Sequence, residues 1–236
     1  MTAASEALFS ALEATWPPLS SHRMGPFRVR DGAGGGKRVS AAVLEGDVSV
    51  VAIEAVEAEL GAKPLFQLRR GQEAFDQMLE AHGYAVLDPT ILYSAPISGI
   101  AEAPRPVSLL AAWPPLAMQR QVWADGGVGP ARIAVMERAC DPKNGFVARY
   151  KNRVAGAGFI AIHDGIAMLH ALQIEPDFRR QGVARYMVRG MAHWALQNGA
   201  DTFALAVTQA NTDARSLYSA LGMTEVDAYH YRERVL

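Results

Sequence analysis

The sequence predicts an α/β fold of the α+β type, in which helices flank a mixed, mostly antiparallel sheet. Three observations support this prediction. Residues 166–184 give an apolar strand, a loop after Pro176, and the start of a helix whose apolar residues recur every three or four positions. Two strands with tight-turn residues between them precede this unit. A strand at 203–207 and another helix follow it.

The first part of the chain repeats the alternation of strands and helices. A helix at 1–16 stops at Pro17 and Pro18. The patterns then predict strands at 27–30 and 39–44, a helix at 48–60, a strand at 64–69, a helix at 72–82, and two strands within 84–93 that bend at Pro89.

Residues 31–38, DGAGGGKR, join the two short strands and allow two interpretations. Their glycine content is typical of a flexible hairpin turn, which is the interpretation we favour. The alternative is a mobile loop that carries Lys37 and Arg38 over the active site.

The sequence also predicts an internal repeat. Residues 61–66 align with 199–204 at an offset of 138, and residues 79–84 align with 218–223 at an offset of 139. A shared strand-helix-strand order could produce the same matches by chance. If the repeat is real, the first half is a degenerate copy of the second half.

A proline-rich stretch at 100–115 predicts a connection between two domains, 1–103 and 104–236, with a short strand at 107–111. Beyond it, the patterns predict helices at 116–123 and 130–139, strands at 146–151, 154–162 and 166–174, and a final antiparallel pair of strands within 224–236.

The start of the helix at Gly182 is a candidate anion site. The first N–H groups of a helix have no partner within it and lie at the positive end of the helix dipole. Because glycine has no Cβ, a phosphate group can approach the backbone closely at Gly182. In the proposed repeat, Asp47 stands near the corresponding point of the first half.

The spacing Arg179-x-x-Gly182-x-Ala184 after an apolar strand resembles the acetyl-CoA pyrophosphate loop of the GNAT N-acetyltransferase superfamily. A second block follows a strand, with the sequence Asn211-x-x-Ala214-x-x-Leu217-Tyr218-x-x-Leu221-Gly222. It resembles the family block in which an Asn contacts the pantetheine arm and a Tyr lies beside the thioester sulfur. The resemblance covers residues 107–236, with its motifs between 166 and 222.

The resemblance implies a GNAT fold, in tandem with a degenerate GNAT-like half at 1–103. It implies an acyltransferase that moves an acetyl group from acetyl-CoA to a primary amine by direct transfer in a ternary complex. The acetyl-CoA ligands it implies are Leu172, Ile174, Arg179, Arg180, Gln181, Gly182, Val183, Ala184, Asn211 and Tyr218. Leu172 and Ile174 would contribute backbone amides that polarise the thioester carbonyl.

Tyr218 and His170 are the candidate catalytic residues. A phenol can protonate the departing thiolate, and the helical spacing from Ala214 points Tyr218 inward. His170, on an apolar strand, can accept the proton of the amine. Each residue has a second interpretation, as a half-buried core aromatic for Tyr218 and as a satisfied core histidine for His170. Cys140 lies outside both motif blocks, and we expect it to be structural.

Composition limits the partners that we expect. The net charge is −1, so the sequence gives no electrostatic indication of a nucleic acid or an anionic membrane as partner. With one cysteine, we expect no metal and a cytoplasmic location. We expect a small-molecule or peptide amine as acceptor and a monomer or homodimer. The alternative function is a non-catalytic module that binds or senses acyl-CoA.

Overall fold

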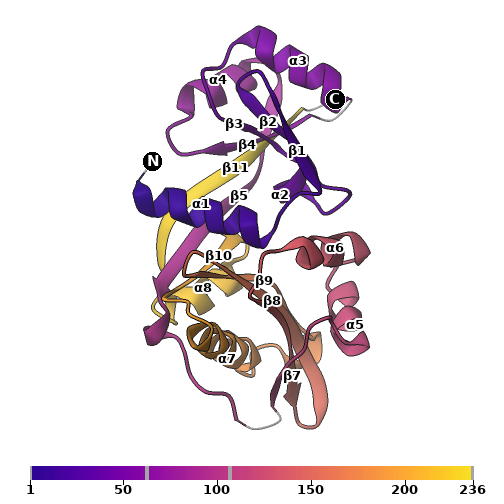
Figure 1. The fold of residues 1–236 in the computed structure, drawn as a ribbon, viewed down its shortest axis with the longest axis vertical. Helices are drawn as coiled ribbons and strands as arrows, with labels where there is room; N and C mark the ends of the chain where they lie inside the picture. Colours follow the sequence, from indigo (N-terminus) through magenta and orange to yellow (C-terminus); the bar gives the residue numbers. More distant parts are fainter. Residues whose placement is uncertain (1, 62–63, 106–107, 235–236) are drawn as a thin grey trace.

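A computed structural model describes residues 2–61, 64–105 and 108–234. Its strands form one mixed sheet in the order β1-β2-β3-β4-β11-β5-β10-β9-β8-β7-β6, with helices on its faces (Figure 1). The elements in chain order are α1 (Ala3–Thr15), β1 (Ser20–Met24), β2 (Phe27–Asp31), α2 (Lys37–Ser40), β3 (Ala42–Leu44), α3 (Val50–Leu60), β4 (Leu65–Arg69), α4 (Glu73–Ala81), β5 (Tyr84–Pro96), a 3₁₀ turn η1 (Ile97–Gly99), β6 (Leu109–Ala111), α5 (Ala117–Asp125), α6 (Pro130–Arg138), β7 (Lys143–Tyr150), β8 (Arg153–His163), β9 (Ile166–Ile174), η2 (Pro176–Phe178), α7 (Val183–Gln197), β10 (Thr202–Thr208), α8 (Thr212–Ser219) and β11 (Thr224–Arg234). The predicted fold class is confirmed.

Two long strands are exchanged between the first and second parts of the chain. β5 lies between β10 and β11, and β11 lies between β4 and β5, with antiparallel pairing throughout. Each part therefore completes its portion of the sheet with the last strand of the other. Figure 1 shows β5 and β11 running side by side through the middle of the elongated molecule.

Two segments of the chain share one topology. β3-α3-β4-α4-β5 and β9-α7-β10-α8-β11 both begin with two parallel strands that are neighbours in the sheet. In both segments, one strand from the other segment separates the second strand from the last. β11 lies between β4 and β5, and β5 lies between β10 and β11. Leu79 on α4 and Tyr218 on α8 come from corresponding helices. This topology agrees with the aligned residues, whereas the division at residue 103 stays a prediction.

The second part packs helices on both faces of its strands. Side chains alternate along β8, so Ile160 and Phe159 point to opposite faces. Ile160 belongs to an apolar cluster that includes Met187 and Met191 of α7. Phe159 belongs to a different cluster, which includes Trp123 of α5 and Met136 of α6. The site described below lies on the α7 side, at the carboxyl ends of β9 and β10.

Two sequence predictions are wrong in detail. Instead of one strand at 39–44, the chain forms α2 and then β3, because Val39 is buried in a tertiary cluster that outweighs its preference for strands. Residues 31–38 lie in the predicted hairpin connection, because β2 and β3 pair antiparallel, and α2 begins within this connection. Residues 84–93 form part of one strand, since Asp88 and Pro89 oppose only His230 and form a bulge that accommodates the proline.

The predicted antiparallel pair at the C-terminus is also wrong. Residues 224–234 form the single strand β11, whose partners β4 and β5 come from the first part of the chain. β1, an exposed edge strand, has no apolar alternation and was missed. Of the strand predicted at 107–111, the structure contains β6 (Leu109–Ala111), and Val107 lies outside the described residues. Residues 62–63 of the aligned repeat and residues 235–236 also lie outside them.

Candidate active site

The site begins where two parallel strands separate. β9 and β10 are paired only as far as Leu169 and Leu205. At the next residues β9 bulges away from its other neighbour β8, and Ala171 takes a positive φ of 48°. The indole N–H of Trp123, on α5, donates to the carbonyl of Ala171 at 2.9 Å. This buried tryptophan holds the bulge, and the ends of β9 and β10 diverge.

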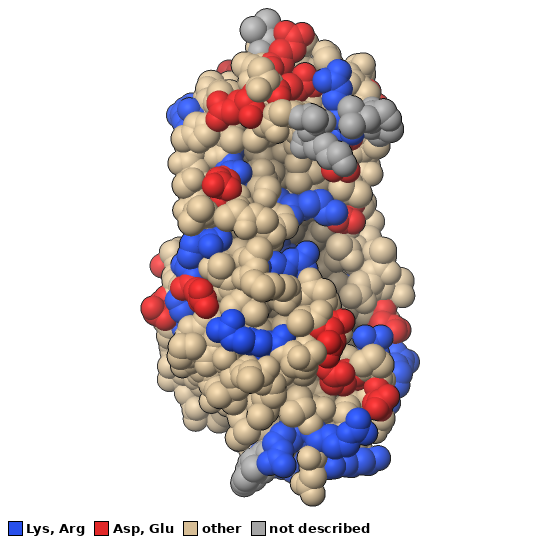
Figure 2. All heavy atoms as spheres, turned by 90° about the vertical axis from the view of Figure 1, so that its right-hand side faces the viewer, with Lys and Arg blue, Asp and Glu red and all other residues tan. Residues whose placement is uncertain are grey.

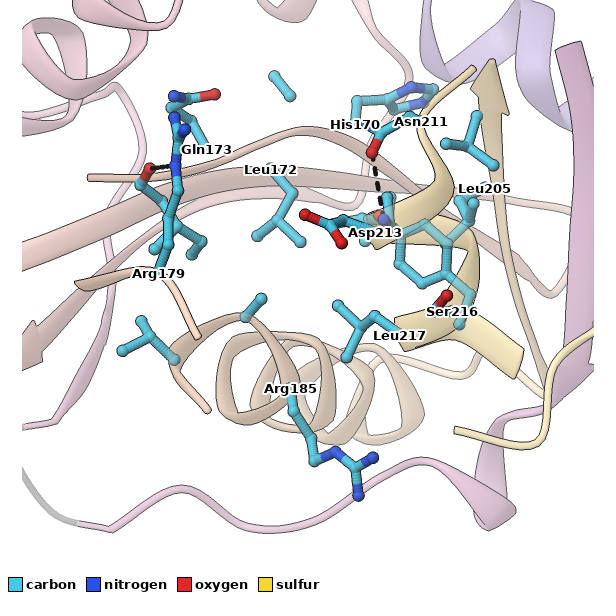
Figure 3. A pocket seen from close by; sticks show the side chains of 18 of the residues that line it. His170, Leu172, Gln173, Arg179, Arg185, Leu205, Asn211, Asp213, Ser216 and Leu217 are labelled. Atoms are coloured by element: carbon cyan, nitrogen blue, oxygen red, sulfur yellow. Dashed lines mark hydrogen bonds between the residues drawn. The ribbon is translucent and has the colours of Figure 1, made fainter. Parts of the chain in front are cut away.

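A cavity of about 870 Å³ occupies the opening between the two strands. Its walls come from the end of β9, the loop before α7, the end of β10 and α8 (Figure 3). In the view of Figure 3, Arg179 and His170 lie at opposite ends of this cavity, and Leu172 projects into it between them. The predicted residues that line it are His170, Leu172, Ile174, Arg179, Arg180, Gly182, Val183, Ala184, Asn211 and Tyr218.

Gln181 is the predicted site residue that the structure does not bring to the cavity wall. Its side-chain amide instead donates to the carbonyl of Asp177 at 2.7 Å, within the turn before α7. Gln181 therefore holds the shape of the loop, and its side chain is not positioned as a ligand.

The start of α7 is open to a ligand. Gly182 is the N-cap residue, with a φ of 81°, and no side chain caps the helix. A Cβ built at Gly182 would meet nothing within 4 Å, so the backbone here faces open space. Within the helix, the first N–H groups have no acceptor. Arg179 and Arg180 add positive charge beside them, and Arg180 also forms an exposed ion pair of 3.2 Å with Asp213.

Asn211 and Tyr218 are both presented by α8. Asn211 is the N-cap residue, and its Oδ1 accepts a hydrogen bond of 3.1 Å from the Ala214 N–H. The Tyr218 ring packs against Tyr93 on β5. Burial raises the pKa of Tyr218 to about 12, although the residue lines the cavity. Among the described residues no hydrogen-bond partner occupies its hydroxyl, which remains available to a ligand.

His170 lies at the inner end of the cavity and is held on both ring nitrogens. Arg38 Nη1 lies 3.3 Å from Nδ1, and Thr15 Oγ1 lies 2.9 Å from Nε2. Because Arg38 can only donate, Nδ1 is the acceptor, and the proton sits on Nε2. The Thr15 hydroxyl donates onward to the Ala11 carbonyl at 2.6 Å. Trp16 packs over the imidazole at 4.9 Å between ring centroids.

The surroundings of His170 favour the neutral imidazole. Burial, followed by the positive charge of Arg38, holds the pKa of His170 well below its usual value of 6.5. The ring is therefore unprotonated at neutral pH, as a base must be. Its Nδ1 lone pair is occupied by Arg38, so accepting a proton from an amine would require Arg38 to move away.

A second cavity, of about 250 Å³, adjoins the first. Arg38, His170, Ala171 and Thr208 line both cavities, so the two meet at the point where β9 and β10 diverge. Other residues that line the second cavity include Trp16, Lys37, Asp88, Arg132 and Tyr229. Of these residues, sequence reasoning identified Lys37 and Arg38, in one of the two interpretations of residues 31–38. It missed the others because they come from distant elements and no local motif marks them.

Neither a metal cluster nor a membrane span is found in the part of the chain that the structure describes. No group of three or more His, Cys, Asp or Glu side chains there could hold a metal ion. No helix within residues 2–61, 64–105 and 108–234 is long and apolar enough to cross a bilayer. Cys140 lies away from both cavities, where its thiol donates to the Ile162 carbonyl at 3.2 Å.

Known proteins resemble this chain in sequence and in fold. Residues 110–223 match the acetyltransferase (GNAT) family. The uncharacterized N-acetyltransferase YobR of Bacillus subtilis is 26% identical over 235 residues, which cover 93% of this chain and 94% of that protein. A GCN5-related N-acetyltransferase from Kribbella flavida has a TM-score of 0.71 at 17% identity, covering 99% of this chain and 96% of the other.

A tandem GNAT protein from the clavulanic acid biosynthesis pathway has a TM-score of 0.61 at 11% identity, and the likeness covers 94% of this chain and 85% of that one. At such identities the solved structures support the fold alone. The match at 110–223 contains both predicted motif blocks and most of the walls of the larger cavity. Through these residues, the second part of the chain matches the GNAT family of acetyltransferases.

Proposed function

We propose that this protein transfers an acetyl group from acetyl-CoA to a primary amine of a small molecule or peptide, by direct transfer in a ternary complex. One observation carries the proposal: a single cavity contains both the open start of α7 and the hydroxyl-bearing Tyr218. The first feature suits a phosphate group, and the second suits the leaving sulfur of a thioester.

We assign the binding of acetyl-CoA to the residues that line this cavity. The N–H groups at the start of α7, with Arg179 and Arg180, would hold the pyrophosphate. Asn211 would contact the pantetheine arm through its side-chain NH₂, because its Oδ1 is engaged in capping α8. The backbone edge of β9 beyond Leu169 has no pairing with β10, which leaves the amides of Leu172 and Ile174 available to the thioester.

In the proposed reaction, the amine nitrogen bonds to the thioester carbon and the carbon–sulfur bond breaks. The nitrogen loses a proton, and the departing sulfur must gain one. The phenol of Tyr218, with a pKa of about 12, keeps its proton at neutral pH. A free thiol has a pKa roughly 3 to 4 units lower, so full proton transfer to a solvated thiolate would be uphill.

Burial disfavours the thiolate as well, which reduces this difference within the cavity. Tyr218 would therefore act first by donating a hydrogen bond to the sulfur as negative charge develops on it. His170 is the proposed base, and this role depends on displacement of Arg38 from its Nδ1.

We further propose that residues 1–103 are a degenerate GNAT-like domain and residues 104–236 the catalytic one. The shared topology of the two segments supports this division. The start of α3 supports it too, because the Ser49 hydroxyl caps this helix by accepting from the Ala52 N–H. The first domain would then contribute β5 and part of the acceptor pocket, without binding a cofactor of its own.

The test is a panel of primary amines with acetyl-CoA, in which release of CoA is followed with each acceptor. We expect at least one class of amine to accelerate release well above the rate without acceptor, with formation of the acetylated amine confirmed by mass spectrometry. If acetyl-CoA binds and no amine in a broad panel accelerates release, the non-catalytic binding module becomes the better description.

A further inference from the structure

The second cavity is lined by more positive than negative side chains. Lys37, Arg38 and Arg132 line it, and Asp88 is the single carboxylate among its lining residues. Lys37 and Asp88 pair with each other at 2.8 Å, so their charges compensate. The two arginines remain. Figure 2, which shows the side of the molecule that includes α6, displays basic side chains around a hollow near the middle of this face.

Arg38 and Arg132 have no carboxylate partner among the described residues. Arg38 donates to His170 and lies beside the Tyr229 and Tyr231 side chains, while its Nε is buried without a hydrogen-bond partner within the described chain. Arg132, which is exposed at the start of α6, makes one long contact of 3.5 Å, from Nη1 to the Gly127 carbonyl. A guanidinium group presents paired N–H donors that match the oxygen atoms of a carboxylate or phosphate. Because both arginines line the second cavity, each offers such donors to an anion there.

The second cavity opens to the first where the reacting groups would meet. The residues common to both are His170 and Ala171 of β9, with Arg38 and Thr208. A molecule in the smaller cavity could therefore present an amine at the junction and keep its remaining atoms between Trp16, Tyr229 and the arginines. The volume of about 250 Å³ accommodates a small metabolite.

We propose that the acceptor is an amine that also carries an anionic carboxylate or phosphate group, bound by Arg132 and Arg38 in this second cavity. The proposal rests on the proposed acetyl transfer and specifies its substrate class. It also gives a role to the first part of the chain, which supplies Trp16, Lys37, Arg38 and Asp88 to the acceptor site.

The test uses sets of matched acceptors. Each set contains an α-amino acid, its carboxamide and its decarboxylated amine, for example leucine, leucinamide and isopentylamine. Phosphoethanolamine and ethanolamine form the phosphate arm. We expect the anionic member of at least one arm to have the higher kcat/KM, and the preferred arm identifies the anion. Equal use of the members, or a preference for the members without an anionic group, would overturn the proposal.

Arg132→Gln is the diagnostic variant because Arg132 is exposed and lies outside the wall of the larger cavity. Losing one charge-assisted contact should raise KM for the anionic acceptor by about 10-fold or more. Affinity for acetyl-CoA should not change. Arg120→Gln, on the neighbouring helix α5 and outside both cavities, is the matched control and should behave as the unmodified protein. An unchanged KM in Arg132→Gln would count against the proposal.

Ligand-observed NMR with the same acceptor sets separates this proposal from the proposed function. It reports binding in the presence of CoA, without turnover. If anionic amines bind through Arg132 and no transfer occurs, the second cavity is a site for anionic amines and the proposed reaction fails. If transfer occurs without any anionic preference in binding or rate, the reaction stands and the proposed acceptor class fails.

Discussion

The starts of α3 and α7 occupy corresponding places in the two segments of shared topology. They differ in whether their first backbone N–H groups are capped by a side chain or left open to a ligand. α3 begins at Ser49, whose hydroxyl accepts a hydrogen bond of 3.3 Å from the Ala52 N–H. α7 begins at Gly182, which has no side chain and a left-handed backbone conformation. One helix satisfies a terminal N–H group with its own side chain, whereas the other leaves these groups to a ligand.

The second difference lies on α4 and α8. Leu79 is fully buried among Phe27, Phe66 and Phe75 in the apolar core of the first part. The aligned Tyr218 is also buried, yet it lines the larger cavity. The comparison teaches that one backbone topology can support an apolar core or a binding cavity. A few residues at a helix start and on a helix face decide which of the two it forms.

The largest expected effect is that of Tyr218→Phe on turnover. The substitution keeps the ring and its packing against Tyr93 and removes the hydroxyl. Turnover should fall by roughly 10²–10⁴ while the affinity for acetyl-CoA is retained. The matched control is Tyr84→Phe in the first part of the chain, where another buried tyrosine hydroxyl pairs with Glu57. Turnover equal to that of the unmodified protein in Tyr218→Phe would reject the acid assignment.

The next effect is that of Gly182→Asp on the affinity for acetyl-CoA. Placing a carboxylate at the start of α7 should cost at least two charge-assisted hydrogen bonds, and Kd should rise by about 10²-fold or more. Gly71→Asp is the control for backbone strain and added charge, since Gly71 has a φ of 87° and similar open space around it. Calorimetry on both folded variants is the measurement. Similar Kd values for the two would remove the start of α7 from the binding site.

His170→Gln should alter the pH dependence of both rate and stability. If His170 is the base, the rate rises with pH through a group whose pKa lies well below 6.5, and the variant loses this limb of the profile. His163→Gln, at the turn between β8 and β9 and outside both cavities, controls for loss of an imidazole. A limb that persists unchanged in His170→Gln would place His170 in the core.

The stability effect of His170 is smaller, and its sign follows from the lowered pKa. Below pH 6.5 the unfolded chain binds a proton at His170 that the folded chain resists. The free energy of unfolding should therefore be unaffected by His170 above this pH. It should decrease as the pH falls below 6.5, by at most about 1.4 kcal/mol per pH unit from this group. When urea unfolding is measured across pH 5–7, the free energy of unfolding of His170→Gln should depend less steeply on pH than that of the unmodified protein.

Sequence reasoning predicted many residues that line the larger cavity because they lie within short motifs. Gly182 and its neighbours span one loop, and Asn211 and Tyr218 lie on one helix, so local periodicity predicts their positions. The proposed acceptor side depends on long-range contacts. Thr15 and Arg38 reach His170 from elements more than 130 residues earlier, and no pattern near His170 indicates their arrival.

The strand exchange escaped prediction for a similar physical reason. The apolar pattern of β11 specifies that it is a strand, but its partners are set by which sheet edges remain unpaired. Those edges belong to β4 and β5, from the first part of the chain. Most of the order of the elements was predictable from the sequence, apart from β1 and α2, whereas the exchange of the last strands was not.

The stoichiometry of acetyl-CoA binding tests the central comparison most directly. Titration calorimetry of the full chain should give one site per chain, because α7 starts with open N–H groups whereas α3 is capped by Ser49. Ser49→Ala should leave this value unchanged, and Gly182→Asp should weaken the one site. Two acetyl-CoA molecules per chain, or a site that survives Gly182→Asp and is lost in Ser49→Ala, would contradict the account.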